Sequence, residues 1–231
     1  MDYLLDGLTQ AFFLLVTGHA ETYSAVWATL VVSTSAIVLC MAFGAPLGFV
    51  LGHADFPGRR ALRLVVDTML SFPTVVIGLL VYSFLSRQGP LGGLGLLFTL
   101  PGIVIGLVLL GLPVVTAMTA SAVENLDRRL KPTLRTLGAS RRQELWATLH
   151  EARFHMALAA VAAYGRIVSE VGIAMMVGGN IKWHTRTITT AIALETGKGQ
   201  FAMGVALGLV LLLVAFAINL GVASLRRLAG K

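Results

Sequence analysis

The sequence predicts an all-α fold, a polytopic membrane helix bundle of about five spans plus a short N-terminal helix. The chain of 231 residues is 56% apolar and only 13% charged, whereas soluble domains carry about a quarter charged residues. Five segments are apolar over about 20 residues, the length of a membrane-crossing helix. The basic residues fall almost entirely between these segments. Lipid is therefore expected to be the solvent for much of the surface.

The predicted spans follow one another within a single domain, residues 1–231, with no linker, low-complexity stretch or convincing repeat. The preceding run at 4–16 is shorter and contains Asp6 and Gln10. We expect it to be an interfacial or partly inserted helix, and a tilted sixth span is the alternative. The five spans are predicted at 26–51, 68–84, 100–123, 156–177 and 201–225.

The basic residues also predict the orientation of the spans. Thirteen of the eighteen Lys and Arg residues lie in the segments 52–67 and 124–154 or in the C-terminal tail, and Arg166 lies within the fourth span. Because cytoplasmic loops carry an excess of Lys and Arg, we expect the N-terminus outside and the C-terminus in the cytoplasm. The opposite side carries the remaining four: Arg87, Lys182, Arg186 and Lys198.

The sequence lacks the residue patterns of several function classes. The basic residues that give the net charge of +7 lie in the loops rather than along one helix face, which favours membrane topology over nucleic-acid binding as their role. The single cysteine, Cys40, excludes an internal disulfide and a cysteine-based metal cluster. The five histidines lack ligand spacing, and residues 196–199 lack the spacing of a phosphate loop. We therefore expect no enzyme activity, metal or bound cofactor, so a partner must supply the energy for any work.

Glycine and proline are frequent within the predicted spans. Glycines four residues apart let helix backbones approach closely in a membrane, and proline removes a backbone hydrogen bond and can bend a helix. Bends suit a conduit that opens and closes, but they also occur in static bundles, so both interpretations stay open. The residues are Gly44, Gly48, Gly52, Gly102, Gly106, Gly204 and Gly208, with Pro46, Pro73 and Pro113.

Two charged residues stand out inside the fourth span. Arg166 and Glu170 are four residues apart, a spacing that places both side chains on one face of a continuous helix. An isolated charge in a span is costly, so we expect the two to form an ion pair in the bundle interior. Such a pair would either line or latch a pathway or simply tie helices together.

The polar stretch 124–153 carries eleven charged residues between two apolar segments. We expect a cytoplasmic coupling helix at 130–150, with a turn at Gly138, that docks a partner; a solvated surface helix is the alternative. Leucine and tryptophan side chains give this segment a partial apolar face, which favours docking. They are Leu134, Leu137, Leu145, Trp146 and Leu149.

The run Leu134-Arg-Thr-Leu-Gly-Ala-Ser140 resembles the glycine-centred cytoplasmic loop of ABC importer permeases, with Gly138 in the position of the family's glycine. Pro132-Thr133-Leu134 replace the family's Glu-Ala-Ala, and His150-Glu151 replace its Leu-Pro. The resemblance implies a type I ABC importer permease fold and an ATP-driven partner.

Four further segments resemble the molybdate/tungstate oxyanion permeases, so the resemblance covers nearly the whole chain. Ser-Glu-Val-Gly together with Val-Gly-Gly-Asn is most similar to tungstate permeases, whereas molybdate permeases tend to have Gly-Glu-Phe-Gly. The resemblance implies import of an oxyanion, tungstate first, with molybdate or sulfate as alternatives. The segments are Phe56-Pro-Gly-Arg59, Ser71-Phe-Pro-Thr-Val-Val-Ile-Gly78, Gly165-Arg-Ile-Val-Ser-Glu-Val-Gly172, and Gly178-Gly-Asn-Ile181 followed by Thr185-Arg-Thr-Ile188.

The resemblance also implies partners and site residues. The partners are a second copy of the chain, two cytoplasmic ATPase subunits that bind ATP, and an external oxyanion-binding protein, all at the inner membrane of a bacterial or archaeal cell. Residues implied in ATPase coupling are Arg135, Leu137, Gly138, Ala139, Ser140, Glu144 and Trp146. Those implied in the pathway or gate are Pro73, Thr74, Arg166, Ser169 and Glu170, and those in docking the binding protein are Arg87, Lys182 and Arg186.

Two rival classes remain open at this point. A secondary transporter driven by an ion gradient would be expected to have paired intramembrane acids and an inverted repeat. The sequence has one acid within a clear span, Glu170, and no such repeat. A non-transporting membrane scaffold is the other alternative, and co-purification with a stoichiometric ATPase would separate both from the importer.

Overall fold

The computed structural model confirms the all-α prediction: every regular element in the part of the chain that it describes is a helix. The described residues are 9, 12, 13, 19–127 and 129–229, the last nine of them as backbone only. The short helix expected at 4–16 lies outside them, apart from three residues.

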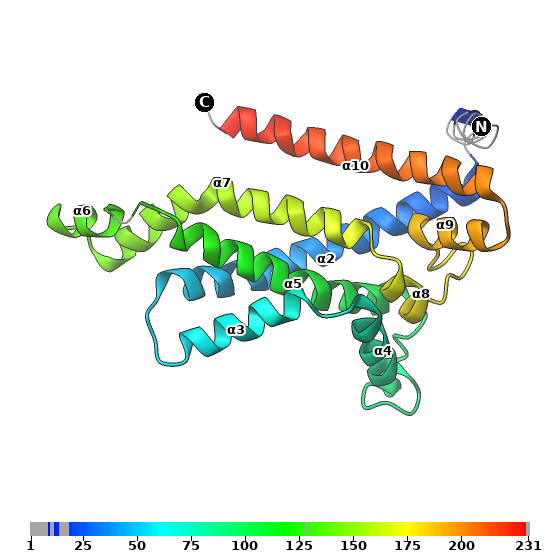
Figure 1. Ribbon diagram of the computed structural model, residues 1–231, viewed down its shortest axis with the longest axis horizontal. Helices are drawn as coiled ribbons and strands as arrows, with labels where there is room; N and C mark the ends of the chain where they lie inside the picture. The colour runs from blue at the N-terminus through cyan, green and yellow to red at the C-terminus, as the bar shows by residue number, and fades with distance from the viewer. Residues whose placement is uncertain (1–8, 10–11, 14–18, 128, 230–231) are drawn as a thin grey trace.

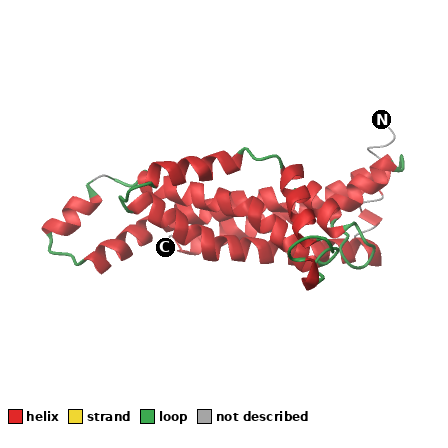
Figure 2. Cartoon of the chain, turned by 90° about the horizontal axis from the view of Figure 1, so that it is seen from below, coloured by secondary structure: helices red, strands yellow, loops and turns green. Residues whose placement is uncertain are grey.

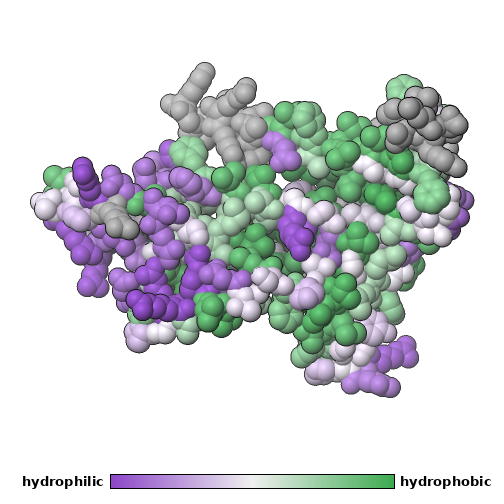
Figure 3. Space-filling view, in the orientation of Figure 1, coloured by the Kyte–Doolittle hydropathy of each residue, from purple (hydrophilic) through white to green (hydrophobic). Residues whose placement is uncertain are grey.

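Four long helices run along the bundle: α2 (Ala20–His53), α5 (Leu100–Glu124), α7 (Arg141–Val168) and α10 (Phe201–Ala229). Connections gather at its two ends, and α6 (Leu130–Thr136) projects from one of them in both views (Figures 1 and 2). Figure 3 shows hydrophilic residues concentrated at this end and hydrophobic residues over much of the middle. We call this the α6 end; the end that carries α9 (Ile188–Gly197) is the α9 end.

Two of the five predicted spans are not continuous helices. The helix α3 (Arg59–Leu70) meets α4 (Thr74–Leu85) at an angle of 99°, and α7 meets α8 (Gly172–Gly178) at 58°. Within the described residues, only α2, α5 and α10 are single helices long and apolar enough to cross a membrane, and the total there reaches five if each bent pair is one span. The predicted spans at 68–84 and 156–177 are therefore present as bent helix pairs, and the first bend lies at Pro73, one of the prolines expected to allow a bend.

The first break has a local cause in Pro73. Proline disfavours a helical conformation in the residue before it and donates no backbone hydrogen bond. Pro73 itself is extended, with φ −62° and ψ 127°, and precedes the first residue of α4. By contrast, α2 and α5 remain helical through Pro46 and Pro113. Proline alone therefore does not break a span of this chain.

The helices α2 and α5 approach each other closely along glycines of α2. A Cβ atom at Gly48 would lie 2.4 Å from the carbonyl oxygen of Thr116, and one at Gly52 would lie 2.6 Å from that of Ala120. Both distances are too short for any side chain. The expected close packing is confirmed here, whereas Gly208 on α10 faces open space.

The main core lies between α2, α5 and α7, and a second cluster joins the broken spans. In the second cluster, α4 contributes residues that pack against α8, and Gly78 lets the backbones approach. The main core contains Val32, Ala36, Cys40, Ile103, Leu107, Val115, Ala163 and Ile167. The second cluster contains Ile77, Val81, Leu85, Leu110, Ile173 and Val177.

An arginine network joins three helices at the α6 end. Arg59 bonds Asp55 at 2.7 Å, Glu124 at 2.8 Å and the carbonyl oxygen of Leu51 at 2.7 Å. Arg63 donates to the Ser121 hydroxyl at 2.7 Å. The start of α3 is thereby fixed to the ends of α2 and α5.

At the α9 end, a threonine hydroxyl fixes α9 to α2. The Ile188 N–H donates to Thr29 Oγ1 at 2.9 Å, and Thr187 and Thr190 form a capping box at the start of α9. A short 3-10 turn, η1 (Gly92–Leu94), lies in the connection between α4 and α5.

We predict that Gly48→Ala lowers the free energy of unfolding by about 1–3 kcal/mol, because the added methyl group has no room against α5. Gly208→Ala is the matched control: its methyl group meets no atom within 4 Å, and alanine favours a helix by up to about 1 kcal/mol over glycine. Thermal unfolding of the purified proteins in detergent measures both. Equal stability of the two variants would contradict the close α2–α5 contact.

Candidate transport pathway and coupling surface

The two breaks meet beside Gly172, at the start of α8. A Cβ atom on Gly172 would lie 3.2 Å from Glu170 Oε1 and 3.8 Å from Thr74 Oγ1. Pro73 directly precedes Thr74. The structure therefore brings together three of the five pathway candidates that the sequence indicated.

Glu170 lies in this junction with its side chain turned inward, and the residue is only 8% exposed. Its Oε1 accepts the N–H of Ile173 at 3.2 Å, and its backbone carbonyl accepts the hydroxyl of Thr189 at 3.0 Å. The first turn of a helix has N–H groups without intrahelical partners. Glu170 thus satisfies one such group of α8 and connects the junction to α9.

The predicted ion pair between Arg166 and Glu170 is wrong. Because α7 ends at Val168 and the chain bends, the four-residue spacing no longer places both side chains on one helix face. Arg166 and Ser169 are exposed, and no ion pair among the described residues joins Arg166 to Glu170. The break separates the two charges.

The coupling segment is a hairpin of two helices rather than one helix over 130–150. After α6, Gly138 adopts φ +76°, a left-handed conformation that favours glycine. Ser140 then caps α7 in a capping box with Gln143. The run that the sequence assigned to the coupling helix therefore continues directly into the span.

An ion pair holds the two arms of this hairpin together. Arg135 Nε on α6 lies 3.1 Å from Glu144 Oε2 in the first turn of α7. The Glu144 side chain is 8% exposed and that of Arg135 is 70% exposed. The hydrogen bond that Arg135 donates to Glu144 raises the pKa of the guanidinium, which therefore remains charged. Lys131, which the sequence analysis did not select, donates to the His53 carbonyl oxygen and ties the hairpin to α2.

The outer surface of the hairpin carries apolar side chains. Leu137 is 78% exposed and Trp146 is 62% exposed, while Ala139 between them is half-buried. The Leu137 and Trp146 side chains are both exposed to solvent near the turn at Gly138, an arrangement suited to contact with another protein. The coupling role of these residues stays a prediction.

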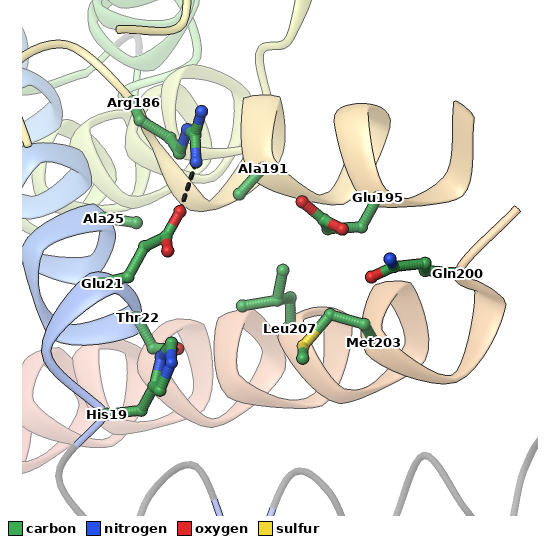
Figure 4. Close-up of a pocket in the computed structure, with 10 residues that line it drawn as sticks. All are labelled: His19, Glu21, Thr22, Ala25, Arg186, Ala191, Glu195, Gln200, Met203 and Leu207. Carbon is green, nitrogen blue, oxygen red and sulfur yellow. Dashed lines mark hydrogen bonds and ion pairs between the residues drawn. The ribbon is translucent and has the colours of Figure 1, made fainter. Parts of the chain in front are cut away.

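A second charged cluster lies at the α9 end. Glu21, near the start of α2, pairs with Arg186 (Figure 4). It also pairs with Lys182, whose Nζ lies 2.7 Å from Glu21 Oε2. Arg186 Nε donates to Asn180 Oδ1 at 3.2 Å. Sequence reasoning missed Glu21, because 165 residues separate it from Arg186. Arg186 thus holds the 179–187 loop to α2.

This cluster limits which docking candidates are accessible. The Arg186 side chain is 15% exposed, whereas that of Lys182 is 50% exposed and Arg87 is exposed on the loop after α4. Lys182 also lies 5.4 Å from the centroid of the exposed Trp183 ring. Docking of a binding protein at this end stays a prediction, with Arg87 and Lys182 as its exposed residues.

A cavity of about 230 Å³ lies between α2, α9 and α10 at this end (Figure 4). Glu21, Glu195 and Gln200 provide polar groups, and Met203 and Leu207 provide an apolar wall. Glu195 is paired with Lys198 at 2.9 Å. Among the described residues, no group of three His, Cys, Asp or Glu side chains could hold a metal ion.

Residues 44–229 match the family of the binding-protein-dependent transport system inner membrane component. The chain belongs to this family. It is 46% identical over 227 residues to the tungstate uptake system permease protein TupB of Campylobacter jejuni, which covers 98% of this chain and 95% of that protein.

Two further transport proteins are similar to this chain. The TupB protein of Peptoclostridium acidaminophilum is 37% identical, covering 98% of this chain and 99% of that protein. The molybdenum transport system permease protein ModB of Escherichia coli K12 is 29% identical, covering 77% of this chain and 82% of that protein. The expected resemblance to molybdate/tungstate permeases is confirmed.

Solved structures of ABC importers share the fold. A bacterial alginate ABC transporter, solved with a periplasmic protein that carries alginate pentasaccharide, matches with a TM-score of 0.76 at 21% identity, covering 97% of this chain and 88% of that chain. The MetNI methionine ABC transporter in an inward-facing conformation matches with a TM-score of 0.73 at 18% identity, covering 91% of this chain and 97% of that chain. The type I ABC importer permease fold is confirmed.

We predict that Glu170→Ala destabilises the protein more than Glu170→Gln. Alanine leaves the buried Ile173 N–H without an acceptor, which costs about 1–3 kcal/mol, whereas glutamine keeps an acceptor oxygen. Glu151→Ala, at an exposed position of α7, is the control and should leave the melting temperature unchanged. If both Glu170 variants melt like the wild type, the carboxylate does not cap α8.

Proposed function

We propose that the chain is the membrane-spanning subunit of an ATP-driven oxyanion importer and that its substrate is tungstate. The identity of 46% to a tungstate uptake permease, over nearly the full length of both proteins, carries this proposal. Molybdate and sulfate are the alternatives, because molybdenum and sulfate permeases match at 29% and 28%.

We propose that two copies of the chain form the conduit, because a symmetric pair places a path on its two-fold axis. Separate cytoplasmic ATPase subunits would bind ATP, and an external binding protein would deliver the oxyanion. The chain itself would carry no cofactor. The match to a family of binding-protein-dependent transport components supports the assignment of these roles to separate subunits.

The geometry of α7 supports a coupling mechanism. This helix runs without interruption for 28 residues from the hairpin at Ser140 to the junction beside Glu170, or about 42 Å at 1.5 Å per residue. A movement that an ATPase imposes on the hairpin is therefore transmitted along one helix to the two breaks. The Arg135–Glu144 pair makes α6 move with α7.

We also propose that the α6 end lies in the cytoplasm, since thirteen of the eighteen basic residues were assigned to this side. Arg128, Arg226, Arg227 and Lys231, which contribute to that number, have no described side chains. We predict that cysteines replacing Arg142 and Lys182, in a Cys40→Ser background, react with a membrane-impermeant thiol reagent from opposite sides. Reaction of both from outside would refute the orientation.

Transport in proteoliposomes tests the proposed function. With the ATPase and the binding protein present, we predict uptake of tungstate that requires ATP and exceeds uptake of molybdate and sulfate. ATP-dependent uptake of another oxyanion would reject the substrate and retain the importer. Uptake driven by an ion gradient without ATP would instead support a secondary transporter, and no transport would support a membrane scaffold.

The coupling turn gives a further prediction. Gly138→Val should leave the permease in the membrane but reduce uptake at least tenfold, because a β-branched residue is strained at φ +76° and shifts the hairpin. Gly138→Asn should retain more uptake, because asparagine tolerates this conformation.

Gly93→Val, in the η1 turn, is the control for Gly138→Val. Gly93 also faces open space and has no positive φ, so uptake should stay at the wild-type level. Co-purification of the ATPase, ATP hydrolysis and uptake are measured together. Wild-type values for Gly138→Val would remove the hairpin from the coupling mechanism.

A further inference from the structure

Arg166 is a charged residue in the last turn of α7, within a predicted span, and it faces outward. Ser169 Oγ donates to its backbone carbonyl oxygen, but among the described residues no carboxylate lies within ion-pair distance of its guanidinium. On insertion scales an arginine at the centre of a span costs about 2.5–3.5 kcal/mol. Its exposure without a partner therefore requires an explanation.

The acidic residues of this chain are engaged elsewhere. Nine of the eleven are described, since Asp2 and Asp6 lie outside the described residues, and eight of the nine have contacts within the chain. The ninth, Glu151, precedes Arg166 by 15 positions on α7, about 22 Å along the helix. The eight are Glu21, Asp55, Asp67, Glu124, Asp127, Glu144, Glu170 and Glu195.

The α7 surface around Arg166 differs from a surface that faces lipid. Ala162, Gly165 and Ser169 are its exposed neighbours, and all three are small. Gly165 and Ser169 also line a mostly apolar cavity between α2, α7 and α10, whose wall includes Leu212. The exposed surface of α10 away from that cavity carries large apolar side chains, such as Leu213 at 54% and Phe216 at 62%. Small residues beside a charge suit a water-filled space or a closely approaching partner, whereas large apolar residues suit lipid.

We infer that Arg166 faces the transport path and that the two copies of Arg166 in the dimer contact the permeating oxyanion. This inference rests on the proposed function. A tetrahedral oxyanion of charge −2 matches two guanidinium groups, one from each protomer. A guanidinium can also donate two parallel N–H bonds to a pair of oxyanion oxygens.

The arrangement also allows release. Transport requires a contact that favours entry of the ion but does not retain it. Arg166 projects from a helix end directly before the 58° break, and Ser169 is the exposed hydroxyl next to it. A displacement of α7 relative to α8 therefore moves the guanidinium, which couples closure of the junction to loss of the anion contact.

Two substitutions separate charge from geometry. Arg166→Gln removes the charge and should reduce oxyanion uptake at least tenfold, while ATPase co-purification and the amount of dimer stay at the wild-type level. Arg166→Lys keeps the positive charge but lacks the planar guanidinium with its two parallel donors, so uptake by this variant should lie between those of the wild type and Arg166→Gln. Wild-type uptake by Arg166→Gln would overturn the inference. Loss of the dimer in Arg166→Gln would also overturn it, because Arg166 would then be a structural contact between the copies.

Chemical restoration of the charge gives a second test. In a Cys40→Ser background, Arg166→Cys should react with water-soluble methanethiosulfonates, and tungstate should slow the reaction. The aminoethyl reagent should restore part of the uptake, and the sulfonatoethyl reagent should not. Phe216→Cys is the lipid-facing control and should react slowly with both. If Arg166→Cys behaves like Phe216→Cys, Arg166 does not face an aqueous path.

These tests distinguish the inference from the proposed function. Uptake by the wild-type complex is measured first, and its absence for tungstate, molybdate and sulfate counts against the function. The thiol reactivity of Arg166→Cys does not depend on transport and reports only where the residue faces. Normal wild-type uptake together with an unreactive Arg166→Cys rejects the inference alone.

Discussion

Backbone groups inside a membrane must find partners within the protein, and this requirement governs the two broken spans. At each break the helix loses its own hydrogen bonds, so the chain can break only where other groups replace them. At the second break, Glu170 accepts the Ile173 N–H, and Thr189 donates to the Glu170 carbonyl. The junction is stable because a buried carboxylate serves the backbone rather than a neighbouring charge.

The proposed mechanism depends on this junction. One long helix, α7, connects it to the hairpin at the α6 end, where Arg135 and Glu144 hold two helices as a unit. At the α9 end, Glu21 fixes the following loop through Lys182 and Arg186. The hairpin and the loop fixed by Glu21 thus lie on either side of the bend between α7 and α8. In the proposed mechanism, a small rotation of α7 at this bend changes the surface that faces a second copy of the chain.

Much of the fold could be predicted because apolar length and the distribution of basic residues are properties of the sequence alone. The turn at Gly138 was also predictable, because a glycine interrupts an apolar face. A bend at Pro73 could be anticipated because proline can bend a helix, although α2 and α5 continue through Pro46 and Pro113. The bend after Val168 could not, because no proline lies in the predicted span at 156–177. The Arg166–Glu170 prediction failed because it assumed a continuous helix, and the Glu21–Arg186 pair was missed because its partners are distant in sequence.

The central claim is that two copies of this chain enclose the path with the exposed face of α7. Ala162, one helical turn before Arg166, is an exposed small residue of that face. In a Cys40→Ser background, Ala162→Cys in the assembled complex should form a cross-linked dimer with a short bifunctional reagent, and its yield should change when ATP binds. Cross-linking through Phe216→Cys on α10, with none through Ala162→Cys, would contradict the account.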